Sequence, residues 1–159
     1  MPPRVRGLAM RAFGAKVGRN VRVHPVTVMN AGWKHLLIED DVYIGPACIL
    51  DLSAPLWIRH GAVLAAGVAV MTHQDAGTSH GSPTAERIGT FARETAIGRY
   101  AFVGARAIVL AGADVGDSGV VGAGAVVTRP VPTGTTVTGA ANNAMMVNWA
   151  IRFRTGKAV

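Results

Sequence analysis

The sequence contains few of the residues that mark several common protein classes. Its single cysteine, Cys48, cannot form an internal disulfide, which fits a reducing compartment and predicts a cytoplasmic protein. Only 6% of the 159 residues are aromatic and 16% are charged, whereas 20 are glycine. This balance is unusual for a helical or doubly wound protein, and it favours a shape with many tight corners and small inward-facing side chains.

Long hydrophobic runs are also missing. The longest apolar stretch, from Val63 to Met71, is interrupted by Gly67, and it is far shorter than the roughly 18 residues that a membrane helix needs. The first residues are basic but lack a continuous apolar core and a small-residue cleavage site, so no signal peptide is expected. At this length we expect one domain and no membrane span.

The net positive charge of the chain favours negatively charged binding partners but does not identify one. The formal net charge is +7, which favours polyanionic partners such as nucleic acid or the phosphates of coenzyme A. Charge alone cannot choose between them. No aromatic stacking platform accompanies the basic residues, however, so a nucleic-acid partner is not expected.

The feature that is present is an aliphatic residue at every sixth position. Most units also have glycine second or a small residue fifth. A helix cannot keep residues six apart on one face, whereas three short strands per coil, with a corner after each, can. The leading positions are all apolar, and they are Val17, Val23, Met29, Ile38, Ile44, Leu50, Ile58, Leu64, Val70, Ile97, Val103, Val109, Val115, Val121 and Val127.

Eighteen residues then form one coil, and successive coils stack as parallel strands about 4.8 Å apart. The pattern predicts about five coils, at 17–34, 38–55, 58–75, 97–114 and 115–132. The expected organisation is a basic N-terminal segment 1–16, a β-helix domain 17–139 from which a loop 75–95 is extruded, and a tail 140–159. The repeat alone fits a non-catalytic solenoid equally well.

The regular stretch from Ile97 to Gly139, with Val-Val-Gly-Ala-Gly-Ala-Val-Val-Thr-Arg-Pro-Val-Pro-Thr-Gly-Thr inside it, resembles the hexapeptide-repeat acyltransferases. The resemblance extends over roughly residues 15 to 140. It implies a left-handed parallel β-helix, a homotrimer with active sites between subunits, and acetyl-CoA as the acyl donor. The segment from Tyr43 to Asp51 resembles the maltose and galactoside acetyltransferases. We therefore expect O-acetylation of a sugar or polysaccharide-precursor hydroxyl, with N-acetylation of an amino sugar as the alternative.

Acyl transfer to a hydroxyl needs a base, and histidine serves this role near neutral pH. The segment Thr72-His73-Gln74-Asp75 ends a coil just before the extruded loop. It resembles the family's catalytic segment, in which an acidic residue follows the histidine, so His73 is the predicted base. No serine or cysteine lies in a nucleophile-elbow pattern, which favours direct transfer over an acyl-enzyme.

The resemblance also implies where the two substrates bind. Ala105 and Ala123, eighteen residues apart, would line the groove for the pantetheine arm, and Thr128 with Arg129 would contact the nucleotide end. Asp51 matches an aspartate that follows leucine in the maltose and galactoside acetyltransferases, and we expect its carboxylate to accept hydrogen bonds from sugar hydroxyls.

The sequence departs from the family at two points. Gly139 is followed by Ala-Ala-Asn-Asn, without the usual proline and basic residue, which leaves Arg152 or Arg154 as substitutes. Gly45 replaces the family's asparagine. No metal is expected, because the zinc-dependent β-helix enzymes need histidines in the coils from Ile97 onward and this sequence has none there.

Overall fold

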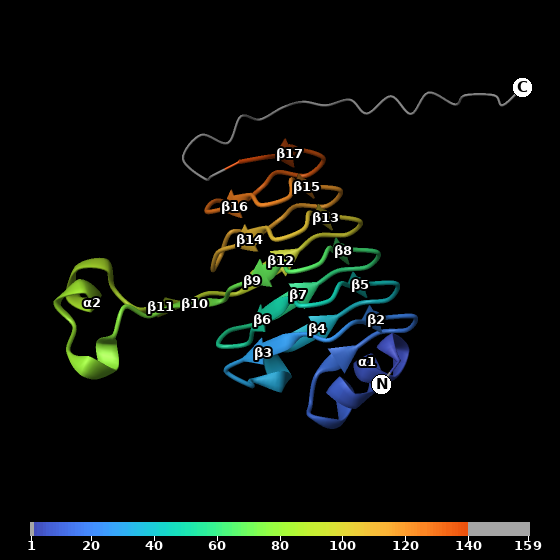
Figure 1. The fold of residues 1–159 in the computed structure, drawn as a ribbon, viewed down its shortest axis with the longest axis horizontal. Helices are drawn as coiled ribbons and strands as arrows, with labels where there is room; N and C mark the ends of the chain where they lie inside the picture. The colour runs from blue at the N-terminus through green and yellow to red at the C-terminus, as the bar shows by residue number, and fades with distance from the viewer. Residues whose placement is uncertain (1, 140–159) are drawn as a thin grey trace, which may run out of the picture.

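The computed structural model describes residues 2–139, so the tail 140–159 with Arg152 and Arg154 lies outside the described residues. The chain winds as a parallel β-helix, with helix α1 at one end of the stack and an arm leaving its middle (Figure 1). None of the helices in the described part of the chain is long and apolar enough to cross a bilayer.

Three parallel sheets form the walls of the β-helix, and each coil contributes one strand to each sheet. Sheet A contains β1 (Lys16–Val17), β4 (Leu36–Ile38), β7 (Leu56–Ile58) and β12 (Thr95–Ile97). Sheet B contains β2 (Arg22–Val23), β5 (Tyr43–Ile44), β8 (Val63–Leu64), β13 (Phe102–Val103), β15 (Val120–Val121) and β17 (Thr136–Val137). Sheet C contains β3 (Thr27–Met29), β6 (Ile49–Asp51), β9 (Ala69–Val70), β14 (Ile108–Val109) and β16 (Val126–Val127).

Isolated parallel bridges from Ile97 to Val115 and from Val115 to Val131 carry sheet A two levels further. The chain therefore passes along all three walls five times and begins a sixth coil with Val131 and β17. The predicted parallel β-helix of about five coils is confirmed.

The leading aliphatic residues stack on one another and fill the interior. Fourteen of the fifteen predicted positions are buried, and Met29 is the exception at 36% exposure. Val28 takes its place and pairs in register with Leu50. The reason is a short unit, since Val28 follows Val23 by five positions instead of six.

Glycine at the second position of a repeat is required by the close stacking of coils. A Cβ atom on Gly104 would lie 2.6 Å from the nitrogen of Ala123 and 2.7 Å from the oxygen of Val121 in the next coil. No side chain fits there without separating the coils.

Helix α1 (Pro3–Ala12) lies against the first coil. Pro3 suits the first turn, where its missing N–H costs nothing, and Gly14, with φ of 105°, follows the helix end. Gly7 and Met10 are buried, with Gly7 packed close to Val17. The helix falls within the segment 1–16 that the sequence separates from the repeat.

The arm begins where the third coil would close. Strands β10 (His73–Gln74) and β11 (Phe91–Ala92) pair antiparallel and form its stem, and the short helices η2 (Thr78–His80) and α2 (Pro83–Ile88) form its end (Figure 1). Thr95 already belongs to β12, so the extruded segment ends before the expected boundary at residue 95. A further short helix, η1 (Trp33–His35), lies between β3 and β4.

Candidate functional site

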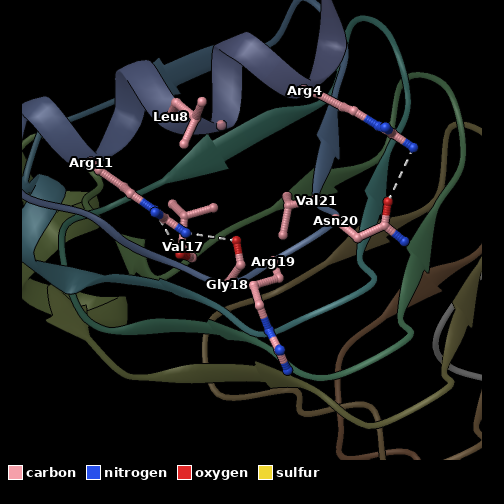
Figure 2. Close-up of a pocket in the computed structure, with 9 residues that line it drawn as sticks. Arg4, Leu8, Arg11, Val17, Gly18, Arg19, Asn20 and Val21 are labelled. Atoms are coloured by element: carbon pink, nitrogen blue, oxygen red, sulfur yellow. Dashed lines mark hydrogen bonds between the residues drawn. The ribbon is translucent and has the colours of Figure 1, made fainter.

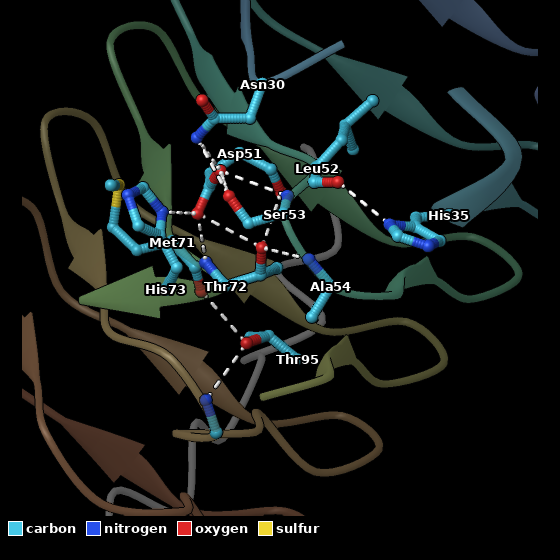
Figure 3. A network of polar contacts seen from close by, with 11 residues as sticks. Asn30, His35, Asp51, Leu52, Ser53, Ala54, Met71, Thr72, His73 and Thr95 are labelled. Atoms are coloured by element: carbon cyan, nitrogen blue, oxygen red, sulfur yellow. Dashed lines mark hydrogen bonds and ion pairs between the residues drawn. The ribbon is translucent and has the colours of Figure 1, made fainter. Parts of the chain in front are cut away.

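A polar cluster lies where three successive strands of sheet C end. Asn30 follows β3, Asp51 ends β6 and Ser53 lies just beyond it, and Thr72 and His73 follow β9. Parallel strands bring their carboxyl ends to the same edge, so residues 21 to 23 apart in sequence meet there (Figure 3).

Asp51 is the centre of this cluster, and its side chain is 0% exposed. One carboxylate oxygen, Oδ2, accepts hydrogen bonds from His73 Nδ1 at 2.6 Å and from the backbone N–H of Thr72 at 2.8 Å. The other oxygen accepts from Asn30 Nδ2 at 3.0 Å and from the Ser53 hydroxyl at 2.8 Å. Burial by itself raises the pKa of Asp51, but these hydrogen bonds outweigh it and hold the pKa well below its usual range.

The ionised Asp51 determines which nitrogen of His73 carries the proton. A carboxylate can only accept, so the proton of the neutral imidazole lies on Nδ1, and Nε2 keeps a free lone pair. The His73 side chain is 26% exposed. The arrangement can therefore accept a proton at Nε2 from a bound molecule.

Two buried threonines fix the backbone just before this histidine. The Thr72 hydroxyl accepts from the N–H of Ala54 at 3.0 Å and lies 3.1 Å from the backbone oxygen of Asp51. The Thr95 hydroxyl donates to the oxygen of Met71 at 2.9 Å. Within residues 2–139, every buried side-chain nitrogen and oxygen has a hydrogen-bond partner.

The burial of Asp51 does not fit the expected contact with acceptor hydroxyls, because its oxygens are turned toward protein donors. The sequence pattern does not predict Asn30, Ser53 and Thr95 as members of this cluster. Their signal is weak, since each is a small polar residue near a corner, where such residues are common on solvated surfaces.

Asp75, the acidic residue of the predicted motif, does not contact the histidine. Its carboxylate accepts hydrogen bonds from the N–H groups of Gly77 and Thr78. These bonds hold the pKa of Asp75 below its usual range, with the Thr78 N–H as the main cause. Asp75 therefore organises the base of the arm.

The residues expected to bind CoA lie in two places. Ala105 and Ala123 are exposed and stacked at the corner that leads into sheet C, where Gly124 N donates to Ala105 O at 2.8 Å. Thr128 and Arg129 are exposed and follow β16. They therefore lie at the carboxyl ends of the sheet C strands, on the same side as His73 and opposite the two alanines. One chain thus does not bring all of these residues together.

The other histidines lie apart from the Asp51 carboxylate. His24 packs against Tyr43, His60 lies edge-on to Tyr100, and His80 is exposed in η2. The ring of His35 lies 2.9 Å from the backbone oxygen of Leu52, beside the cluster (Figure 3). In the part of the chain that the structure describes, no three His, Cys, Asp or Glu side chains gather as metal ligands would.

Comparison with known proteins supports the repeat and the fold. A family model described as the hexapeptide repeat of succinyl-transferase matches residues 94–129. A maltose O-acetyltransferase from Clostridium difficile 630 is 22% identical, with a TM-score of 0.65 over 84% of this chain and 70% of that one. A hexapeptide-repeat acetyltransferase from Vibrio cholerae O1 biovar eltor, complexed with acetyl-CoA, is 18% identical, with a TM-score of 0.62 over 85% and 72%. A galactoside acetyltransferase in complex with coenzyme A is 19% identical, with a TM-score of 0.60 over 86% and 76%.

Residues 94–129 thus match a hexapeptide repeat, and the fold of the chain is similar to that of these acetyltransferases. This fold is the left-handed parallel β-helix that these acetyltransferases share.

Proposed function

We propose that this protein is an acetyl-CoA-dependent O-acetyltransferase whose acceptor is a hydroxyl of a sugar or a polysaccharide precursor. The observation that carries the proposal is the 2.6 Å pair between buried Asp51 and His73, which leaves Nε2 of a partly exposed imidazole free. This is the arrangement of a general base held in one tautomer by a carboxylate. The structural neighbours, a maltose O-acetyltransferase and a galactoside acetyltransferase, support the choice of acceptor class.

In the proposed reaction, His73 Nε2 accepts the proton of the acceptor hydroxyl while that oxygen attacks the thioester carbonyl carbon. Asp51 stabilises the imidazolium that forms. The carbon–sulfur bond then breaks, and the proton passes from Nε2 to the departing CoA sulfur. The acetyl ester and the free thiol are the products, and the protein ends in its starting protonation state. Asp51 acts here as a positioning residue, which replaces its expected contact with the sugar.

The exterior of the later coils suits the donor. Ala105 and Ala123 present small side chains and accessible backbone, so a narrow amide-bearing arm could approach closely. Arg129 is an exposed cation of the kind that pairs with phosphate. We assign these residues to acetyl-CoA, with Thr128 beside Arg129 at the nucleotide end.

We further propose a homotrimer with the active site between two subunits. The support is the separation described above, since His73 and the two alanines lie at opposite edges of sheet C. A second copy could supply one group to the other. Exposed Phe102, Ile108 and Leu110 on the walls of the later coils are suitable for such a contact. The catalytic unit would be residues 17–139, and the cytoplasm is the compartment we propose.

Binding of the donor is the first test. Calorimetry should show micromolar binding of acetyl-CoA that is about tenfold weaker for Arg129→Ala, because one charged phosphate contact is lost. Arg87→Ala, an exposed arginine of α2, is the matched control and should bind as the wild type does. No binding to the wild type at millimolar acetyl-CoA would refute the transferase proposal and leave a scaffold.

Turnover is the second test. Release of CoA thiol is followed with a panel of sugars, amino sugars and nucleotide sugars. Product that resists alkaline hydrolysis would indicate an amide, and therefore N-acetylation in place of the O-acetylation proposed here.

A further inference from the structure

The positive charge of the described residues is concentrated at one end of the β-helix. Residues 1–38 contain seven of the 16 lysines and arginines and none of the nine acidic residues, the first of which is Glu39. The remaining residues therefore carry nine charges of each sign and balance. Residues 39–139 contain six basic and all nine acidic residues, and residues 140–159 contain three basic residues. Within residues 2–139, the basic excess therefore lies in α1 and the first coil.

Helix α1 is attached to the first coil by two of its arginines. Arg6 Nη1 donates to the oxygen of Val23 at 2.9 Å, and Arg11 Nε donates to the oxygen of Val17 at 2.8 Å. With Gly7 and Met10 also buried, one side of the helix is committed to the β-helix.

The other side of α1 carries apolar side chains together with arginine. Val5 is 45% exposed and Leu8 is 57% exposed. Arg4 is also exposed, and its Nη2 donates a hydrogen bond of 3.4 Å to the neutral amide of Asn20. Figure 2 shows Arg4 and Arg11 extending from the helix on the two sides of Leu8.

A groove of about 420 Å³ runs between this helix and the first coil, lined by Arg4, Leu8 and Arg11 on the helix side. Arg19 lies on its opposite wall, where its guanidinium is paired with Asp40 at 2.8 Å. The groove itself has no acidic lining residue. A negatively charged group could therefore approach Arg4 and Arg11 without meeting a carboxylate on the helix.

We propose that the outer face of α1 and this groove form a docking surface for an anionic phospholipid bilayer. Leu8 and Val5 would enter the headgroup region, and Arg4 would contact lipid phosphates at the same depth. Arg11, which donates to the oxygens of Val17 and Gly18, would add its positive charge to the surface. A free phosphate would need the arginines but not the exposed apolar side chains between them. Nucleic acid would likewise gain little from Leu8 and Val5, which favours the bilayer.

Docking through α1 would place the polar cluster around His73 at a defined height above the bilayer. His73 follows the third coil, two coils above the first, so its level lies about 10 Å further along the stack. The surface is independent of the proposed catalytic activity, and each can fail without the other.

The test is sedimentation with vesicles made of equal parts phosphatidylcholine and phosphatidylglycerol, compared with vesicles of phosphatidylcholine alone. We expect about tenfold or greater preference for the anionic vesicles, which declines as salt is raised. Equal binding to both vesicles, or binding to neither, would overturn the proposal.

The matched variants locate the surface. Arg4→Glu combined with Leu8→Ser should weaken binding to anionic vesicles by about tenfold or more. Arg99→Glu with Ile88→Ser makes the same chemical changes at exposed positions on a later coil and on the arm, and it should bind as the wild type does. Circular dichroism melting checks that both double variants are folded.

Two competitors distinguish the other anions. If inorganic phosphate, or a short DNA duplex at equal phosphate concentration, displaces the protein from vesicles completely, the site recognises phosphate or nucleic acid instead of a bilayer. Retention on vesicles in the presence of both supports the docking surface.

Discussion

The later coils, from Ile97 to Val137, and the earlier coils, from Lys16 to Gln74, have the same fold but different regularity. The later coils keep a strict six-residue unit as far as Val127, after which buried Val131 follows by four. Their interior contains only aliphatic and small residues such as Val103 and Ala107. The earlier coils have a short unit, insertions between coils and the base of the arm. The two fully buried polar residues of that region, Asp51 and Thr72, lie beside these departures.

This difference shows how a solenoid can acquire a polar site. A strict repeat places identical environments above one another, and each buries its apolar residue with its backbone paired to the next coil. Where the unit is broken, backbone N–H groups and side chains turn toward one another instead. Asp51 can be buried because the broken units supply its donors.

The largest expected effect is on catalysis, from His73→Ala. Turnover should fall by about 10²–10⁴-fold, because the proton acceptor is lost while the stack remains intact. The matched control is His24→Ala, a histidine on the outside of the first coil. CoA release and thermal melting are measured on both. If His24→Ala lowered turnover by a comparable factor, the catalytic role would not be specific to His73 and the polar cluster.

A change in the regular coils should affect stability instead. Ile97→Ala removes a fully buried side chain and should lower the free energy of unfolding by about 2–5 kcal/mol. Ile88→Ala, on the exposed surface of α2, should cost little. Urea unfolding compares them. If Ile97→Ala abolished turnover while stability was unchanged, the separation of roles between the two regions would be wrong.

Asp51→Asn should lower both turnover and the free energy of unfolding by moderate amounts. We expect a loss of about 10–100-fold in kcat, because an amide no longer stabilises the imidazolium or holds its tautomer. Binding of acetyl-CoA should remain. Unchanged kcat with lower stability would mean that the pair is structural only.

The same variant gives a prediction for pH. The folded-state pKa of Asp51 lies below its unfolded value of about 3.9. Its carboxylate therefore stabilises the fold above that pH, and the contribution is lost as pH falls through the folded pKa. The stability difference between wild type and Asp51→Asn should be constant near neutral pH and shrink below about pH 4. Melting curves across this range measure it.

The smallest effect on stability is expected from shortening the arm. Replacing residues 76–89 with Asn-Gly would close β10 and β11 as a two-residue hairpin. The melting temperature should change by only about 2 °C, since the removed segment contributes little to the core. A large drop would show that the arm belongs to the stable stack.

The regular part of this architecture was predictable because the pattern and the structure share one period. Each leading residue of the later coils lies where the six-residue frame puts it, and His73 lies at the base of the extruded segment. The frame fails at Met29, since one missing residue moves Val28 inward.

The six-residue pattern could not predict the contacts that surround Asp51. Its partners are Asn30, Ser53, Thr72 and His73, and their contacts depend on insertions whose length is not a whole unit. Register across an insertion is fixed by backbone geometry, which residue spacing does not contain.

The arginines of α1 have one more consequence, which concerns self-association. A stack of parallel strands ends in a row of unpaired N–H and C=O groups, and another chain can add to such an edge. Arg6 and Arg11 occupy the carbonyl oxygens of Val23, Val17 and Gly18 at the first edge. The helix thus closes the end at which fibres of stacked molecules would otherwise grow.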